Sequence, residues 1–265
     1  MNSASKKAIL VVSFGTSYEN TRKLTIEAIE HDIADAFPAC PTYRAWTSKM
    51  IIAKLKKRDG LTIHTVKEAL EQMLLDGITD VIVQPTHVIN GIENDQMKAD
   101  ALSFRDRFSS IVFGNPLLTT EEDNQAIVRV VADEFRDMDP DTALVLMGHG
   151  TEHYANTVYA ALDYRFKDTG HKNIFSGTVE AYPALDSLLR AADSFHPKKI
   201  VLAPFMIVAG DHAQNDLAGA DPDSWMNRLS SEGYEVTPVL KGLGEYPQVR
   251  QILVEHVQQA MNVSV

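Results

Sequence analysis

The 265-residue sequence contains a single cysteine, Cys40. One cysteine excludes an internal disulfide, a CxxC redox pair and a thiolate zinc cluster, and it fits a protein of the reducing cytoplasm. Long apolar runs are also missing, because those at residues 8–14 and 200–210 are far shorter than the roughly 18 residues that a membrane span needs. We therefore expect no membrane partner, and we interpret the run after Lys6 and Lys7 as a first strand rather than a signal peptide.

An excess of positive charge is lacking as well. The 25 Lys and Arg residues stand against 36 Asp and Glu, which gives a net charge of −11, so binding of nucleic acid is not expected. The sequence has no GxxxxGK[ST] phosphate loop, GxSxG elbow or HExxH zinc motif, and residues 242–247 lack the third glycine of a dinucleotide fingerprint. These absences argue against common nucleotide and hydrolase chemistries, and we expect no organic cofactor.

Strand and helix patterns alternate along the chain, which is 45% apolar. Strands are predicted at residues 8–14, 41–46, 80–84, 110–113, 142–147, 173–179, 199–206 and 234–239. The clearest helical patterns lie at residues 18–37, 65–75, 121–135, 184–194 and 245–261. Near-continuous apolar strands are typical of parallel sheets that helices cover on both faces, so we expect an α/β fold with doubly wound, mainly parallel sheets.

Two pairs of segments suggest an internal duplication. Ser-Phe-Gly-Thr at 13–16 resembles Gly-His-Gly-Thr at 148–151, and residues 81–93 resemble residues 200–212. We therefore predict an N-terminal lobe at 1–116 and a C-terminal lobe at 117–244, with a last helix at 245–262 that packs on the first lobe. The alternative is that strand ends of α/β proteins simply resemble one another. A cleft between two such lobes is the expected ligand site.

Three polar residues are predicted at the carboxyl ends of strands in the second half. His149 lies between two glycines, Glu180 follows the strand at 173–179, and His212 follows the strand at 199–206. Two imidazoles and one carboxylate suit a borderline divalent cation and leave coordination positions open for a substrate. His153 is the rival ligand, because it would share a face with His149 if a helix began there. Each of these residues could instead be an ordinary loop side chain.

The first half carries different groups at the matching positions. Phe14 aligns with His149, and Glu93 aligns with His212, while His87 precedes the Asn90-Gly91 turn. We therefore expect one lobe to bind the metal and the other to hold an organic partner. His87 could also be a plain core or turn histidine.

Residues 44–58 form a basic segment with no acidic residue. Its members are Arg44, Lys49, Lys54, Lys56, Lys57 and Arg58. Such a segment could steer a polyanionic small molecule, and a solvated amphipathic helix is the alternative.

Eight short motifs resemble those of the anaerobic cobaltochelatases of the CbiK type, a family of class II chelatases. They are Val-Val-Ser-Phe-Gly-Thr-Ser at 11–17, Met-Ile-Ile at 50–52, Arg-Asp-Gly at 58–60, Ile-Asn-Gly at 89–91, Met-Gly-His-Gly at 147–150, Val-Glu-Ala-Tyr-Pro at 179–183, Val-Ala-Gly-Asp-His at 208–212 and Asp-Ser-Trp at 223–225. The likeness extends from about Lys7 to Asn262 in matching order. This sequence departs from the family pattern at residues 91–94, where it has Gly-Ile-Glu-Asn instead of Gly-Asp-Glu-Tyr. The role of Glu93 therefore stays open.

The resemblance implies a chelatase fold of two similar α/β lobes that inserts Co²⁺ into a sirohydrochlorin-type tetrapyrrole, with loss of two pyrrole protons, in anaerobic cobalamin synthesis. Fe²⁺ is an alternative substrate. The resemblance also implies that His149, Glu180 and His212 hold the metal, and we expect His149 and Glu180 to be catalytic, with His149 also the principal base. We expect the organic substrate to contact residues at two loops, Ser13, Phe14, Gly15, Thr16, His87, Ile89 and Asn90. Alternatives are a ferrochelatase of sirohaem or haem synthesis and a non-catalytic binding protein. A homo-oligomer is compatible with the sequence.

Overall fold

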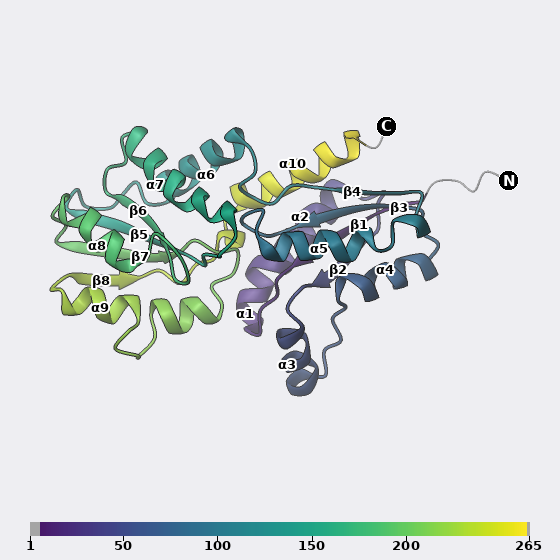
Figure 1. Ribbon diagram of the computed structural model, residues 1–265, viewed down its shortest axis with the longest axis horizontal. Coiled ribbons are helices and arrows are strands. Elements are labelled where there is room, and N and C mark those ends of the chain that lie inside the picture. The colour runs from purple at the N-terminus through teal and green to yellow at the C-terminus, as the bar shows by residue number, and fades with distance from the viewer. Residues whose placement is uncertain (1–5, 264–265) are drawn as a thin grey trace. The chain divides into compact units, whose positions relative to one another are not determined.

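The computed structural model describes residues 6–263, which form two compact α/β units (Figure 1). The first unit comprises the chain up to Thr119 together with the C-terminal segment from Pro247, and the second comprises Thr120 to Tyr246. Within the described residues, no helix is both long and apolar enough to cross a membrane.

The first unit is built on a four-stranded parallel sheet with the order β2-β1-β3-β4. Its strands are β1 (Lys7–Ser13), β2 (Thr42–Trp46), β3 (Asp80–Pro85) and β4 (Ser110–Phe113). Its helices are α1 (Glu19–Arg22), α2 (Ala28–Ala36), α3 (Lys49–Asp59), α4 (Val66–Leu75), α5 (Ile92–Leu102) and α10 (Pro247–Val263).

The second unit has a parallel sheet of the same kind, with the order β6-β5-β7-β8. Its strands are β5 (Thr142–Gly148), β6 (Ile174–Thr178), β7 (Lys199–Pro204) and β8 (Glu235–Pro238). Its helices are α6 (Glu121–Glu134), α7 (Thr157–Asp168), α8 (Leu185–Asp193) and α9 (Trp225–Ser231).

The two sheets agree in register as well as in order. Val12 of β1 pairs with Pro85 of β3, and Met147 of β5 pairs with Pro204 of β7. In both sheets the first strand lies between the second and the third, so the winding direction reverses once, after the second strand. This shared topology supports the internal duplication that the paired motifs suggest.

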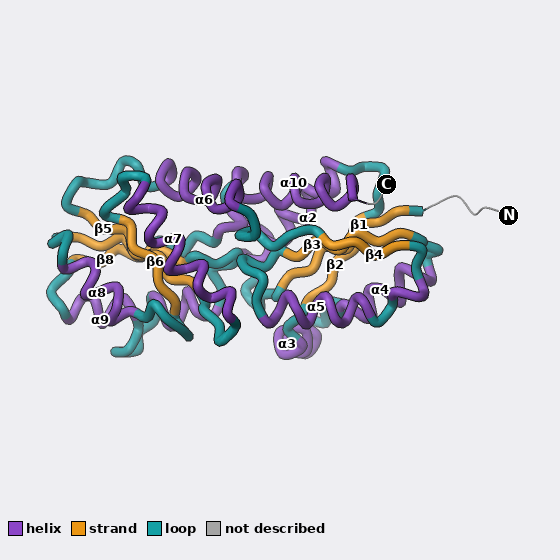
Figure 2. Tube along the Cα trace, turned by 45° about the horizontal axis from the view of Figure 1, so that its top comes forward, coloured by secondary structure: helices purple, strands orange, loops and turns teal. Residues whose placement is uncertain are grey.

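Helices cover both faces of each sheet (Figure 2). In the first unit α2 and α10 lie on one face and α4 and α5 on the other, where their apolar residues pack against alternate residues of β1, Ala8, Leu10 and Val12. In the second unit α8 and α9 pack against the alternate residues Ala143 and Val145 of β5. This period-two alternation is typical of strands that are covered by helices on both faces.

The expected elements are present, with differences at their ends and in one helix. The pattern at 18–37 is not one continuous α-helix, because a π-helical turn, Lys23–Glu27, separates α1 from α2. The strand expected at 199–206 ends at Pro204, since the chain turns into a loop at the sheet edge. Helices α5, α7 and α9 were absent from the clearest sequence patterns, and α5 is mostly polar, with only Asn94, Met97 and Ala101 buried.

Candidate metal centre

His149 is the first residue after β5, between Gly148 and Gly150. Gly150 has a φ of +88°, a left-handed conformation that favours glycine, and a Cβ there would lie 2.9 Å from the backbone nitrogen of Ala181. A Cβ on Gly148 would lie 2.4 Å from the ring of Tyr159. The two glycines therefore let the loop pack tightly, and the His149 side chain is left 44% exposed.

Glu180 comes from the loop after β6, which runs beside the His149 loop. The backbone N–H of Glu180 donates to the carbonyl oxygen of His149 at 2.9 Å, so the strand pairing continues past the end of the sheet. Asn156 links the same two loops, because its amide oxygen accepts from the Thr151 N–H at 3.0 Å and its amide nitrogen donates to the Tyr182 carbonyl. These contacts hold His149 and Glu180 side by side.

His212 follows β7 and lies at the start of a π-helical turn, Ala213–Leu217. Its ring is edge-on to that of His149, with centroids 4.5 Å apart and an interplanar angle of 89°. Its Nε2 lies 3.9 Å from Glu180 Oε1. Glu180 therefore lies between the two imidazoles, since its other oxygen, Oε2, is 3.6 Å from His149 Nδ1.

The structure brings together the three residues that the sequence singled out, which we call the donor trio: His149, Glu180 and His212. Each can offer one ligand atom such that all three atoms lie within 4.8 Å of one another. A cation centred among donors this far apart lies about 2.8 Å from each, so movements of less than ~1 Å would give bonds of about 2.1 Å. The side chains are 32% to 52% exposed, which leaves space for such movement and for a substrate.

The hydrogen bonds of both imidazoles determine which nitrogen is free. His149 Nδ1 lies 2.8 Å from the Gly150 carbonyl oxygen, and His212 Nδ1 lies 2.7 Å from Asp216 Oδ2. Both partners can only accept, so Nδ1 carries the proton in each ring. The lone pair of each neutral imidazole is then on Nε2, where it can bind a cation or accept a proton.

The first unit has no such set at the equivalent positions. The backbone N–H of Ser48 donates to the carbonyl oxygen of Phe14, as that of Glu180 does to His149, so Ser48 corresponds to Glu180. Phe14 and Glu93 correspond to His149 and His212 when residues are counted on from the last paired positions, Val12 with Pro85 and Met147 with Pro204. Among the described residues, no cluster other than the donor trio has three His, Cys, Asp or Glu groups close enough to bind one cation.

The loop at 13–16, expected to contact the organic substrate, has only one exposed side chain. Phe14 is 41% exposed, whereas Ser13, Gly15 and Thr16 are buried. The Ser13 hydroxyl accepts from the Thr86 hydroxyl at 2.9 Å. Gly15 has a φ of +105°, and a Cβ there would lie 2.5 Å from the Trp46 ring. In this loop Phe14 is therefore the side chain that presents an apolar surface.

The loop after β3 carries the other expected substrate contacts. The ring nitrogens of His87 are fully buried and form no hydrogen bond of normal geometry, and burial lowers its pKa to about 4, with a smaller opposing effect of Asn94. The Asn90 amide donates to Thr119 and accepts from Asn94. Ile89 is half-buried. His87 is thus neutral at pH 7, and its nitrogens do not face solvent.

The helix that would place His153 on the same face as His149 is not present at that position. The backbone at His153 is extended, and a short 3₁₀ turn begins only at Tyr154. The His153 Nδ1 accepts from the Ala155 N–H at 3.2 Å, and its ring stacks on Tyr154. The side chain therefore caps this turn and is not part of the donor trio.

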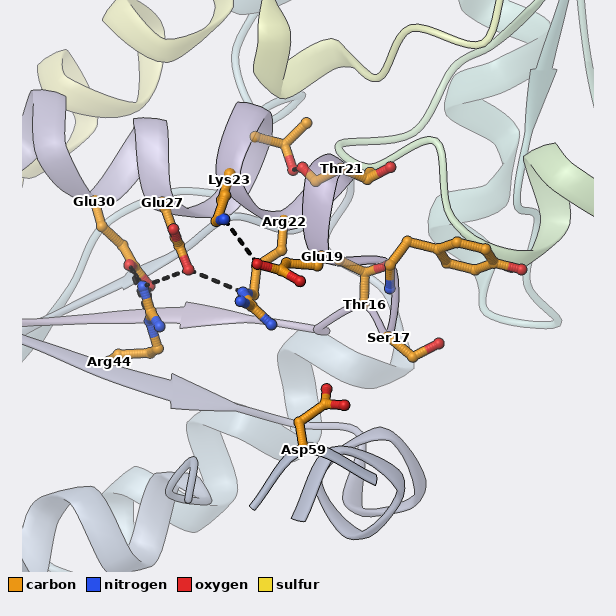
Figure 3. A network of polar contacts seen from close by, with 12 residues as sticks. Thr16, Ser17, Glu19, Thr21, Arg22, Lys23, Glu27, Glu30, Arg44 and Asp59 are labelled. Atoms are coloured by element: carbon orange, nitrogen blue, oxygen red, sulfur yellow. Dashed lines mark hydrogen bonds and ion pairs between the residues drawn. The ribbon is translucent and has the colours of Figure 1, made fainter. Parts of the chain in front are cut away.

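The basic segment divides into paired arginines and unpaired lysines. Arg44 on β2 binds Glu30 and contacts Glu27, which also binds the buried Arg22 at 2.9 Å (Figure 3). Arg58 donates to Asp59 and to the Ser17 carbonyl. Within residues 6–263, four lysine side chains of the segment form no ion pair, those of Lys49, Lys54, Lys56 and Lys57. All four are on α3, so the helical alternative and a steering role are compatible.

The sequence and geometry can be compared with known proteins. A family model described as cobalt chelatase (CbiK) matches residues 7–262. The chain belongs to the CbiK cobalt chelatase family. It is 39% identical over 260 residues to the sirohydrochlorin cobaltochelatase of Salmonella typhimurium, with 98% of each chain covered. It is 32% identical to the sirohydrochlorin cobaltochelatase CbiKC of Nitratidesulfovibrio vulgaris, with 97% of this chain and 91% of that one covered.

Solved structures show the same fold as this CbiK family member. SirB from Bacillus subtilis with Fe³⁺ superposes with a TM-score of 0.65 at 14% identity, and 98% of this chain and 97% of that one are covered. CbiX, described as the terminal enzyme for siroheme biosynthesis in denitrifying bacteria, gives a TM-score of 0.56 at 15% identity, with 96% and 99% covered. The predicted α/β class with two parallel sheets is confirmed.

Sequence reasoning missed two residues that support the donor trio. Asp216 binds His212, and Asn156 links the loops of His149 and Glu180. The spacing of four residues between His212 and Asp216 was a usable signal, because residues four apart in a helical turn are neighbours. Asn156 gave no such signal, since its partners come from loops that are distant in the sequence.

Proposed function

We propose that this chain is a sirohydrochlorin cobaltochelatase that inserts Co²⁺ into sirohydrochlorin in the anaerobic synthesis of cobalamin. The observation that supports this function is the convergence of two imidazoles and a carboxylate within 4.8 Å in a chain of the CbiK family. Insertion binds one divalent ion to the four ring nitrogens and releases the two pyrrole protons. The reaction therefore needs a base and a weakly held metal, and it transfers no electrons.

Each member of the donor trio has a role in this proposal. His149 is both metal ligand and principal base, since its Nε2 lone pair can bind the cation and, when the metal leaves, accept a pyrrole proton. Glu180 neutralises positive charge between the two imidazoles, and His212 completes the metal site. Because the metal is a substrate, its ligands must exchange, and two histidines with one carboxylate bind less tightly than a closed set of thiolates.

The proposal is tested by an optical assay of sirohydrochlorin metallation by the wild type and by His149→Ala. Loss of the base should lower the rate of Co²⁺ insertion by about two orders of magnitude. His153→Ala is the matched control, because this histidine is four residues away on the same loop and outside the donor trio. It should retain the wild-type rate.

Three results would contradict the proposal. A full rate for His149→Ala would show that His149 is not the base. A loss of rate in His153→Ala alone would show that His153, and not His149, is the ligand. Binding of Co²⁺ and sirohydrochlorin with no metallation above the uncatalysed rate would indicate a binding protein. The same assay with Fe²⁺ at equal free concentration tests the preference for Co²⁺, since both ions accept these ligands.

A further inference from the structure

Asp216 holds His212 by the nitrogen that faces away from Glu180. Its Oδ2 lies 2.7 Å from His212 Nδ1, while His212 Nε2 lies 3.9 Å from Glu180 Oε1. Because a carboxylate only accepts, the Asp216 contact keeps the proton on Nδ1. The lone pair on Nε2 is thereby directed to the side of the ring where Glu180 lies.

The π-helical turn fixes Asp216 relative to His212. Two of its residues, Ala213 and Leu217, are buried, and Leu217 packs in the core of the second unit. The backbone is bonded at both ends of the turn, from Gln214 to Gly210 and from Gly219 to Asn215, each at 3.0 Å. Asp216 therefore lies in a turn whose neighbouring residues are packed and hydrogen-bonded independently of the contact between Asp216 and His212.

The two imidazoles of the donor trio have partners of different charge. His149 Nδ1 donates to a neutral carbonyl, that of Gly150, whereas His212 Nδ1 donates to a carboxylate. A carboxylate behind a metal-binding histidine orients the ring and makes its free nitrogen a stronger donor. It also adds a negative charge near the site, so that Glu180 and Asp216 together balance the charge of a divalent ion.

We propose that Asp216 is a positioning residue that makes His212 the anchor of the metal, and that His149 is the ligand that releases it. His149 Nδ1 donates its hydrogen bond to a neutral carbonyl, and the one carboxylate near it, Glu180 at 3.6 Å, is itself a member of the donor trio. This inference rests on the proposed function, because it assumes that the donor trio binds Co²⁺. A stronger ligand on one side and a weaker one on the other let the cation stay bound while one position opens to the macrocycle.

The test is Co²⁺ binding without any tetrapyrrole, measured by competition with a chromogenic chelator. Asp216→Ala should weaken Co²⁺ binding by 10-fold to 100-fold, the usual cost of removing such a partner. Asp216→Asn should give a smaller loss, because an amide oxygen can still accept from Nδ1 without carrying the charge. The KM for Co²⁺ should rise in both variants, while the KM for sirohydrochlorin stays at the wild-type value, a split that general misfolding would not give.

Two further variants complete the design. Asn215→Ala is the matched control, because this exposed residue is in the same turn and only its backbone is used; it should bind Co²⁺ like the wild type. If His212→Ala weakens binding and both Asp216 variants do not, the inference about Asp216 is wrong and the proposed function stands. If His212→Ala also binds Co²⁺ normally, the donor trio itself is wrong. Should Asp216→Ala fail to fold, Asp216→Asn decides.

Discussion

At the residue scale, the buried His87 leads us to predict that the free energy of unfolding falls at acid pH. Its pKa is lowered by burial to about 4, whereas an exposed histidine in the unfolded chain has a pKa near 6.5. As the pH falls from 6.5 to 4, the unfolded chain binds a proton that the folded chain does not, so unfolding becomes easier. Between pH 7.5 and pH 5 this effect should remove about 2 kcal/mol from the free energy of unfolding.

The measurement compares urea unfolding of the wild type and of His87→Gln at these two pH values. The variant should lose about 2 kcal/mol less between pH 7.5 and pH 5, because it has no imidazole to protonate. His31→Gln is the control for replacing an exposed histidine, since the His31 side chain is 74% exposed, and it should not reproduce the effect of His87→Gln. Equal acid sensitivity in wild type and His87→Gln would show that His87 titrates normally.

Some residues of the candidate site could be predicted from the sequence, and others could not. His149, Glu180 and His212 could be chosen because each follows an apolar strand, and carboxyl ends of parallel strands share one edge of a sheet. For His87 the sequence left a substrate contact and a plain core or turn histidine both open, because the residue stands between a buried strand and the Asn90-Gly91 turn. His153 remained an alternative ligand at the level of the sequence, since its spacing from His149 has meaning only if a helix begins there, and no helix does.

At the element scale, the strands were more predictable than the helices. Strand β4 has the predicted bounds and β5 is one residue longer, because both are short apolar runs bounded by turn residues. Helix α3 was only an alternative interpretation of the basic segment, since Leu55 is its one buried residue and an apolar stripe is missing. The π-helical turns at Lys23–Glu27 and Ala213–Leu217 were not predicted from the sequence, and each has two buried residues.

From the positive charge of helix α3, we predict that its lysines attract the substrate. The carboxyl end of α3 is tied through Arg58 to the carbonyl of Ser17, next to the loop of Phe14. Replacing Lys54, Lys56 and Lys57 with Glu reverses three charges and should raise the KM for sirohydrochlorin, by about tenfold at low ionic strength. The effect should shrink at high salt, because exposed charges are screened.

Steady-state kinetics at two salt concentrations measure this effect. The charge-preserving replacement of the same three lysines with Arg is the control, and its KM should equal that of the wild type. Co²⁺ binding without tetrapyrrole should be the same in both triple variants, because the donor trio is in the second unit. A KM that does not change at low salt would remove the steering role and leave α3 as a solvated helix.

At the scale of the whole molecule, the two units share one sheet topology but carry different side chains at equivalent positions. The sheet orders and registers of the two units match, yet the positions of the donor trio are occupied in the first unit by Phe14, Ser48 and Glu93. The α/β class was predictable from the alternation of strands and helices. The equivalence of Ser48 and Glu180 was not, because it depends on a backbone hydrogen bond outside the strands rather than on similar sequence.

This division of residues predicts that Co²⁺ stabilises one unit and not the other. The second unit holds the donor trio, and α10 belongs to the first unit, where it packs on α2, β3 and β4. At a Co²⁺ concentration 100 times the Kd, linkage adds about 2.7 kcal/mol, which slows exchange of the most protected amides by about 100-fold. Hydrogen exchange followed by mass spectrometry should show this slowing in peptides of β5 and β7 and not in those of β1 and α10, and His212→Ala should abolish it. Equal slowing in both units would mean that they unfold as one cooperative body, because a ligand bound in either would then stabilise both.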